Sequence, residues 1–302
     1  MNRLNALVIR NIKLYFKDKG MFFSSLITPI ILLVLYGTFL RNVYYDSFTS
    51  ALTAAGATVS DKLISGFVAG ELVSSLLAVS CVTVAFCSNL IMVQDKITGA
   101  RNDLMVAPLK KSTLAMSYYL ATLFSTLLIC FFAAAICFGY IAACGWYLSV
   151  DDVVAVIRDI VLLVLMGTAL SSLVNYPLTT QGQASAVGTI VSAGYGFLCG
   201  AYMPISQFSK GIQKVMAFLP GTYGTSLLRN HTLRGTFAEM EAKGFPAQVI
   251  EAMKDSVDCN IYFFDKKVSL GAMNLVLFGT IVLALGIYIV INLISSRRRA
   301  AA

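Results

Sequence analysis

The sequence has few charged residues and very few groups suited to acid–base or metal chemistry. Of 302 residues, 13% are charged, 58% are hydrophobic and only 1 is a histidine. Soluble domains carry roughly 25% charged residues, so this chain would lack the polar surface that a soluble fold of its size needs. The apolar residues also fall in long runs, as a lipid bilayer requires. We therefore expect an integral membrane protein.

Signatures of soluble enzymes are also absent. The phosphate loop GxxxxGK[ST], the zinc motif HExxH and the nucleophile motif GxSxG do not occur, so this chain cannot bind ATP through a phosphate loop. His231, beside Arg229 and Asn230, is interpreted as a surface residue rather than a catalyst. The sequence predicts no catalytic residue and no metal or other cofactor on this chain.

The cysteines give no metal-ligand pattern. None of the 7 forms a CxxC pair, so neither a zinc site nor a disulfide framework is indicated. Most lie in apolar runs, where cysteine behaves as a small hydrophobe. A bridge between Cys144 and Cys199 is conceivable near one face, but free thiols are favoured; Cys259 lies far from any expected membrane helix.

The net charge of +8 is interpreted as a feature of a membrane protein rather than of a nucleic-acid-binding protein. The basic residues flank apolar runs, where they set orientation and contact anionic headgroups. No basic stretch interleaved with aromatic residues occurs in a soluble segment, so membrane lipid is an expected partner and nucleic acid is not.

Six stretches are long and apolar enough to cross a bilayer, which takes about 20 residues in a helix. They span residues 22–40, 63–93, 114–142, 153–176, 184–203 and 269–294. The second would be about 46 Å long at 1.5 Å per residue, so one end should project or tilt. The sequence predicts an all-α integral membrane fold, a single domain over residues 1–302.

The basic residues predict the orientation of these helices. They cluster in residues 1–20, in the loop 94–113 and after the last helix, whereas the loop 143–152 has none. Because short cytoplasmic loops are rich in Lys and Arg, both termini are expected in the cytoplasm. The segment 204–267 is then extracellular, and its apolar stripe between Met203 and Pro220 predicts a short helix in an ordered cap.

Residues 1–20 have the pattern of an amphipathic helix. Apolar residues recur at helical spacing between Leu4 and Tyr15, and another face carries Arg3, Arg10, Lys13 and Lys17. Such a helix lies in the membrane interface with its basic face toward headgroups or a cytoplasmic partner. A plain positively charged flank accounts for the same residues equally well.

Three charged residues fall inside the expected helices, namely Glu71, Arg158 and Asp159. Charges in a membrane are costly and are functional candidates by default. All three lie in the outer halves of their helices, and Glu71 is placed to pair with Arg158. A structural ion pair is therefore favoured over a substrate site.

A ladder of small residues marks the fifth expected helix. Its members recur every four residues: Ala184, Gly188, Ser192, Gly196 and Gly200. Such faces allow close approach of helix backbones, either in ordinary packing within the chain or at a pathway or dimer contact. In the first expected helix, Pro29 should kink or loosen the backbone.

Two segments have a recognisable order of residues. The first is Gly99–Pro108, GARNDLMVAP, and the second runs from Gly200 to Pro204 and on through Pro220, Tyr223 and Arg229. They resemble the cytoplasmic loop and the segment after the fifth helix of ABC-2 type ABC transporter permeases, the transmembrane subunits of bacterial ABC exporters. The first segment departs from the usual loop by carrying Ala, Arg and Asn where Thr, Leu and Glu are common, with an acid displaced to Asp103.

The resemblance implies partners and roles. Such a permease dimerises with the same or a homologous chain in the bacterial inner membrane, and it binds two soluble ABC ATPase subunits that hold ATP and magnesium. The ATPase-coupling element would be Gly99, Arg101, Asp103, Leu104 and Pro108, and Gly99 would permit a tight turn at its start. Pro29 and the small-residue ladder would lie at the pathway or dimer contact. Pro204, Pro220, Tyr223 and Arg229 would form an external gate.

The expected function is export of an amphiphilic substrate, such as a drug, a peptide, a lipid or a lipid-linked glycan, driven by the partner ATPase. The alternative is an ion-coupled carrier or channel that acts without an ATPase. An integral membrane enzyme is disfavoured because the catalytic groups are missing.

Overall fold

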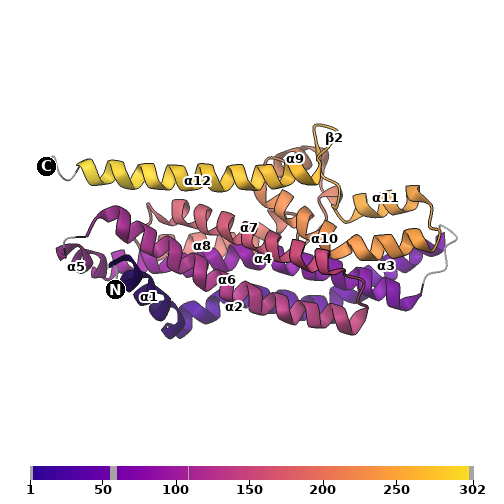
Figure 1. Cartoon of the computed structure of the whole chain (residues 1–302), viewed down its shortest axis with the longest axis horizontal. Helices are drawn as coiled ribbons and strands as arrows, with labels where there is room; N and C mark the ends of the chain where they lie inside the picture. Colours follow the sequence, from indigo (N-terminus) through magenta and orange to yellow (C-terminus); the bar gives the residue numbers. More distant parts are fainter. Residues whose placement is uncertain (1–2, 55–59, 108, 299–302) are drawn as a thin grey trace.

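The computed structural model describes residues 3–54, 60–107 and 109–298, and it is an elongated bundle of helices (Figure 1). In chain order the elements are α1 (Arg3–Lys17), α2 (Lys19–Leu35), the π-helix η1 (Tyr36–Leu40), α3 (Arg41–Ala54), α4 (Asp61–Ile97), α5 (Ala100–Val106), α6 (Lys111–Cys144), α7 (Val150–Asn175), α8 (Gln181–Leu198), the 3₁₀-helix η2 (Ile205–Gln207), α9 (Lys210–Met216), α10 (Pro220–Ala242), α11 (Ala247–Ser256), β1 (Tyr262–Phe263), β2 (Lys266–Lys267) and α12 (Leu270–Arg298).

Five helical stretches of the described residues are long and apolar enough to cross a membrane. They are Lys19–Ser50, Asp61–Ile97, Lys111–Cys144, Val150–Asn175 and Leu270–Ile294. This confirms the all-α membrane class. The fifth expected helix is present as α8, but it begins with the polar residues Gln181 and Gln183 and is not among the five, so the total of six stays a prediction.

The first expected helix is longer than the sequence pattern indicated. Asp18 begins it by accepting a hydrogen bond from the Met21 amide at 3.0 Å. Helical structure then continues through the buried Pro29 into η1 and α3 without a break. The π-helical turn between Tyr36 and Leu40 is a local irregularity of the kind often found at functional sites.

The helix α4 is the core of the bundle. Nearly every residue from Leu63 to Val93 is buried, because α2, α6, α7, α8 and α10 all pack around it. Its polar side chains bond within the bundle, as when Asn89 donates to Ser171 at 2.9 Å and to Ser172 at 2.8 Å. The outer helices instead expose large apolar side chains, such as Phe132 of α6 and Leu275 of α12, which suits contact with lipid.

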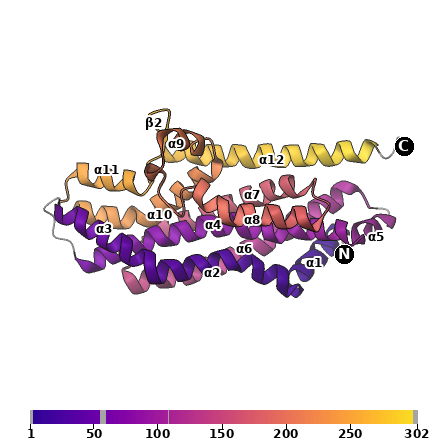
Figure 2. The ribbon, with the colours of Figure 1, turned by 180° about the vertical axis from the view of Figure 1, so that it is seen from behind.

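The two ends of the bundle differ in what they carry. The start of α1 and the end of α12 lie at one end together with α5, and α3 and α11 lie at the other (Figures 1 and 2). The prediction that both termini and the loop 94–113 lie on the cytoplasmic side of the membrane stays a prediction.

The segment 204–267 is ordered, as expected, but much of it is not a cap on the surface. Its longest helix, α10, packs into the bundle against α4, α7 and α12. Gly70 of α4 leaves room for this approach, since an added Cβ would lie 2.8 Å from Leu233. Other parts of the segment lie at the surface, where Phe218, Phe263 and Phe264 form an aromatic cluster at the hairpin β1–β2.

The helix α1 packs on the bundle through one face. Leu7, Asn11 and Tyr15 are buried, and Tyr15 shares a hydrogen bond of 2.6 Å with Ser25 of α2. Of the expected basic face, Arg3, Lys13 and Lys17 are exposed, whereas Arg10 is half-buried. The expected helix is therefore present as α1, and its cation Arg10 belongs to the bundle, whereas its place in the membrane interface stays a prediction.

Candidate functional site

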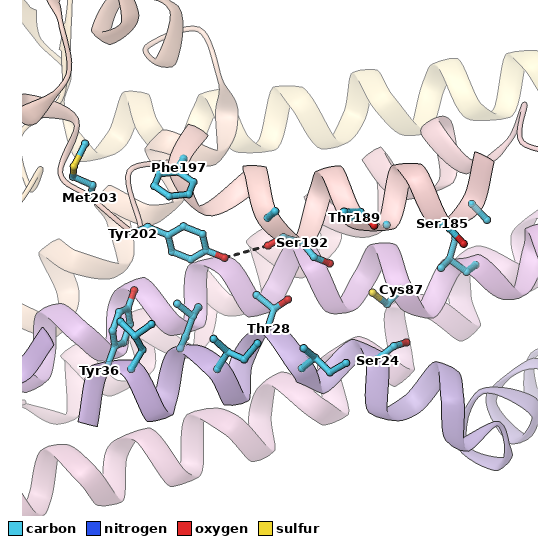
Figure 3. Close-up of a pocket in the computed structure, with 18 of the residues that line it drawn as sticks. Ser24, Thr28, Tyr36, Cys87, Ser185, Thr189, Ser192, Phe197, Tyr202 and Met203 are labelled. Carbon is cyan, nitrogen blue, oxygen red and sulfur yellow. Dashed lines mark hydrogen bonds between the residues drawn. The ribbon is translucent and has the colours of Figure 1, made fainter. Parts of the chain in front are cut away.

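A large groove lies between α2 and α8, with α4 at its floor (Figure 3). Its volume is 930 Å³. The lining residues come mainly from α2, η1 and α8, and they are Ser24, Ile27, Thr28, Ile31, Leu32, Leu35, Tyr36, Leu40, Cys87, Leu90, Gln181, Ala184, Ser185, Gly188, Thr189, Ser192, Ala193, Phe197, Tyr202 and Met203.

None of the described residues that line the groove has a charged side chain. Its walls are mostly apolar, and the polar groups are mainly hydroxyls such as those of Ser24, Thr28 and Ser192 (Figure 3). Apolar walls with a few hydrogen-bonding groups are typical of sites for organic molecules. The groove can therefore accept an amphiphile.

The small-residue ladder of α8 keeps the groove open. Ala184, Gly188 and Ser192 line it, and a Cβ added to Gly188 would meet no atom within 4 Å. The ladder thus faces the groove over these positions rather than a close neighbouring helix of the same chain. Pro29, in contrast, is buried within α2 and is not a lining residue.

One end of the groove is closed by two tyrosines. The Tyr202 hydroxyl donates to the Ser192 carbonyl at 3.2 Å (Figure 3), and the Tyr36 hydroxyl donates to the Ala201 carbonyl at 3.2 Å. The Tyr202 ring lies over Gly196, where an added Cβ would be 2.3 Å from Cζ. Gly196 is therefore needed for close packing against Tyr202 of the same chain.

Gly200 does not continue the ladder, contrary to expectation. The helix α8 ends at Leu198, and Gly200 adopts a φ of +73° in the following turn. An added Cβ there would lie 2.7 Å from Ile205 and 3.1 Å from a carboxylate oxygen of Asp258. The turn requires glycine both for its left-handed backbone and for this close approach.

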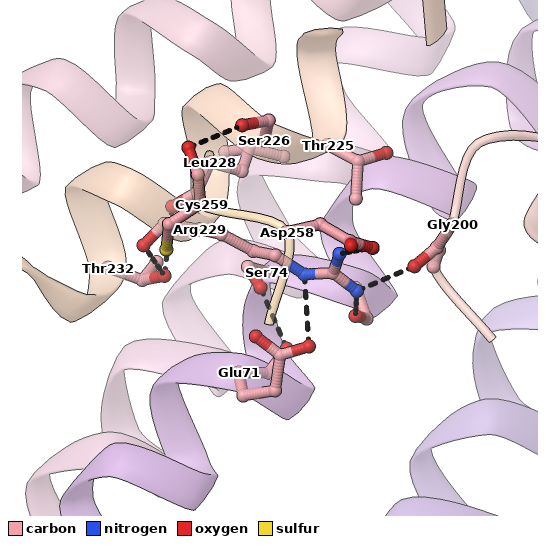
Figure 4. Close-up of polar contacts among 12 residues, drawn as sticks. Glu71, Ser74, Gly200, Thr225, Ser226, Leu228, Arg229, Thr232, Asp258 and Cys259 are labelled. Atoms are coloured by element: carbon pink, nitrogen blue, oxygen red, sulfur yellow. Dashed lines mark hydrogen bonds and ion pairs between the residues drawn. The ribbon is translucent and has the colours of Figure 1, made fainter. Parts of the chain in front are cut away.

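A buried ionic cluster holds this turn (Figure 4). The Arg229 guanidinium lies 3.0 Å from Glu71 Oε1 and 3.1 Å from Asp258 Oδ2. It also donates to the Gly200 carbonyl at 2.7 Å and to the Ser75 hydroxyl at 3.0 Å. The contact with Glu71 is an ion pair by distance, although its geometry is not that of a hydrogen bond. Burial raises the pKa of the Asp258 carboxyl above its usual value, while Arg229 and the Ile205 amide oppose this rise.

The cluster corrects two predictions. Glu71 pairs with Arg229 and not with Arg158, which instead lies 2.9 Å from its neighbour Asp159. Arg229 was expected in an external gate, but its side chain is 1% exposed, because α10 carries it into the bundle. Of the other expected gate residues, Pro204 is buried, Pro220 begins α10, and the Tyr223 hydroxyl donates to the Ala217 carbonyl at 2.5 Å.

His231 is not a surface residue, contrary to its interpretation from the sequence. It is buried, and its Nδ1 lies 2.5 Å from Asp159 Oδ2. One helical turn along α10, Arg234 pairs with Asp152 of α7. These contacts fix α10 against α7. Among the described residues no group of acidic, cysteine and histidine side chains can hold a metal ion, and the seven cysteines are free thiols.

The short helix α5 lies at the opposite end of the bundle from α11. Gly99 precedes it with a φ of +82°, so the sharp turn expected there is present. Asp103 is exposed, Leu104 packs against the bundle, and Arg101 is half-buried. Pro108 lies outside the described residues.

The helix α1 is tied to this same end. The Arg10 guanidinium forms two hydrogen bonds to Asp95 of α4, at 2.6 and 3.0 Å, and Tyr118 of α6 donates to the same carboxylate at 2.6 Å. The hydrogen bond with Asp95 raises the pKa of Arg10 above its usual value. Three helices therefore meet at one buried acid.

A family model for the ABC-2 type transporter matches residues 2–232, which is most of the chain. The chain belongs to the ABC-2 type transporter family. No curated protein gives a significant match. The match begins just before α1 and ends in α10 just beyond Arg229 and His231, so it includes α5, both walls of the groove and most of the ionic cluster. This ABC-2 protein is therefore a multi-pass transporter permease, a membrane component and not itself an ATPase.

The sequence of this ABC-2 permease revealed only part of the site. The ladder of α8 and the turn at Gly99 were visible as patterns. The cluster of Glu71, Arg229 and Asp258 was missed because its members are far apart in sequence. A weak signal was present, since no acidic residue lies near Arg229 in the sequence.

Proposed function

We propose that this chain is the permease subunit of an ATP-driven exporter that moves an amphiphilic substrate out of the cell. A drug, a peptide, a lipid or a lipid-linked glycan would suit such a site. The uncharged groove of 930 Å³ between α2 and α8 carries this proposal. A soluble ABC ATPase would bind ATP and magnesium, and a second permease subunit would face the groove.

The helix α4 supports a route from the ATPase to the groove. Its 37 residues extend about 55 Å at 1.5 Å per residue. At the α5 end Asp95 binds Arg10 of α1, and Lys96 donates to the Tyr176 carbonyl of α7 at 2.5 Å. At the far end Glu71 faces Arg229, which holds the Gly200 turn. A tilt of α4 driven from α5 and α1 would therefore reach the turn that closes the groove.

In such an exporter, the two tyrosines at the end of the groove would hold it closed. Tyr36 and Tyr202 bond to backbone carbonyls on the α8 side of the groove. If α2 moved away from α8, the Tyr36 bond would break first, because it is the one that joins the two walls. The groove would then open toward the end that carries α10 and α11.

Co-purification tests the proposal directly. A tagged full chain is isolated from its native membrane with a mild detergent, and the bound soluble proteins are identified. We expect an ABC ATPase to be recovered, and ATP hydrolysis by the reconstituted complex to change when candidate amphiphiles are added. An ion-coupled carrier or channel predicts a different result, namely ion flux through liposomes that contain the purified chain alone, with no ATPase bound.

A further inference from the structure

A recess lined with basic residues lies at the α5 end of the bundle and shares no lining residue with the groove. Five helices or their ends contribute to it. The residues that matter here are Lys96 of α4, Arg101 of α5, Lys111 of α6, Tyr176 after α7, and Tyr288 and Asn292 of α12. Three cationic side chains from three helices therefore surround one opening.

No acidic side chain among the described residues lines this recess. Asp95 is buried and is already engaged by Arg10 and by Tyr118. Asp103 is exposed on α5 and does not line the recess. Positive charge is therefore in excess at this place.

Lys96 satisfies its hydrogen bonds without an anion. Its ammonium donates to the carbonyls of Asn175, Tyr176 and Leu178 at 3.3, 2.5 and 3.0 Å. The carbonyls of Asn175 and Tyr176 end α7, where the helix dipole places partial negative charge. Lys96 therefore fixes the end of α7 and adds a positive field to the recess.

The surroundings of Arg101 differ from those of Lys96. Its side chain is half-buried, and within residues 3–54, 60–107 and 109–298 no hydrogen bond or ion pair engages its guanidinium. A partly desolvated cation without an anion is unfavourable, and a guanidinium offers a planar fork that suits two oxygen atoms of a phosphate. The geometry points to an anionic oxygen ligand in front of Arg101.

The surroundings of the recess identify the source of that ligand. Tyr288 and Asn292 lie on α12, whose neighbouring residues Val290 and Leu293 expose 52% and 50% of their surface. This apolar face suits the chains of a lipid. The recess has only 20 Å³ of room, enough for about one water-sized group, so a phosphate oxygen can enter but a nucleotide cannot.

We propose that the recess binds the headgroup phosphate of an anionic phospholipid from the leaflet on the α5 side. Arg101 would be the main contact, the field of Lys96 and Lys111 would add to it, and the acyl chains would lie along α12. Basic pockets between membrane helices are suited to such headgroups. The bound lipid would hold α5 against the bundle. This site is independent of the exporter function, because binding needs neither the ATPase nor a substrate.

Lipid titration of the purified full chain in a neutral detergent tests this site. Phosphatidylglycerol is compared with phosphatidylcholine of the same acyl chains and with sodium phosphate, and bound lipid is counted by native mass spectrometry. We expect a clear preference for phosphatidylglycerol. Arg101→Gln should weaken its binding about fivefold, the effect of roughly 1 kcal/mol for one cation.

Two further variants distinguish a defined lipid-binding site from general electrostatic attraction of anionic lipids. Arg101→Lys keeps the charge without the fork and should give an intermediate loss. Lys110→Gln removes an exposed cation from the same end of the chain and should change binding less than twofold. Equal binding of both lipids, full competition by sodium phosphate, or an equal loss in Lys110→Gln would each overturn the proposal. If Arg101→Gln fails to fold, the lipid binding of Arg101→Lys, which retains a cation, tests the proposed site instead.

Discussion

At the scale of single residues, Arg229 has the most demanding environment. Its side chain is 1% exposed, and two acids on different elements share its charge. Removing one partner of a buried ion pair leaves an uncompensated charge, which costs about 3–5 kcal/mol. We expect Arg229→Met to destabilise the protein by this amount, as measured by the thermal unfolding of the detergent-solubilised chain.

Lys243 provides the control for this experiment. Its side chain is 42% exposed and pairs with Glu239, which is 39% exposed, and exposed ion pairs contribute only about 0–1 kcal/mol. Lys243→Met should therefore have a small effect. If both variants unfolded at the same temperature as the unchanged protein, the ionic cluster would not stabilise the Gly200 turn.

Gly196 gives a second prediction at the residue scale. An added Cβ would lie 2.3 Å from the Tyr202 ring, so Gly196→Ala should displace this ring and break its bond to Ser192. The loss of stability should nearly vanish when Gly196→Ala is made in a Tyr202→Ala background, because the clash is then gone. A double-mutant cycle of thermal stabilities measures this coupling, and strictly additive effects would show that the two residues do not interact.

At the scale of elements, α8 presents two glycines in different surroundings. Neither Gly188 nor Gly194 would meet an atom within 4 Å through an added Cβ, but only Gly188 lines the groove. Gly188→Trp should fill the groove and abolish transport while the protein still inserts and folds. Gly194→Trp, on the same helix, should leave transport near normal. Normal transport by Gly188→Trp would exclude the groove as the substrate pathway.

The residues of the short helix α5 face in different directions, some toward solvent and others toward the bundle. Asp103 is exposed and Leu104 is packed against the bundle, so Asp103 is placed to meet an ATPase. We expect Asp103→Lys to uncouple export while membrane insertion stays intact, because a reversed charge would oppose the original contact. Asn102→Lys, also exposed on α5, tests for a general effect of added positive charge. Substrate-stimulated ATP hydrolysis at the normal level in Asp103→Lys would contradict this role.

At the scale of the whole molecule, the two ends of the bundle predict opposite accessibility. Ser256 is exposed on α11 at one end, and Ser112 is exposed on α6 at the end that carries α5. With Cys259 removed, Ser256→Cys should react with an impermeant maleimide in intact cells. Ser112→Cys should react only after the cells are opened. The reverse pattern would place the termini outside.

The sequence by itself determined the membrane class, the approximate positions of most helices and the sharp turn at Gly99. These features depend on local composition, because a bilayer-spanning helix and a left-handed glycine are both encoded over a few neighbouring residues. The partners of Glu71, Arg229 and His231 were decided only by the tertiary structure. Their side chains meet because α10 packs back between α4 and α7, and no local pattern specifies which distant charge fills a buried position. The groove also depends on the tertiary structure, because it forms where α2 and α8 are separated from each other and both pack on α4.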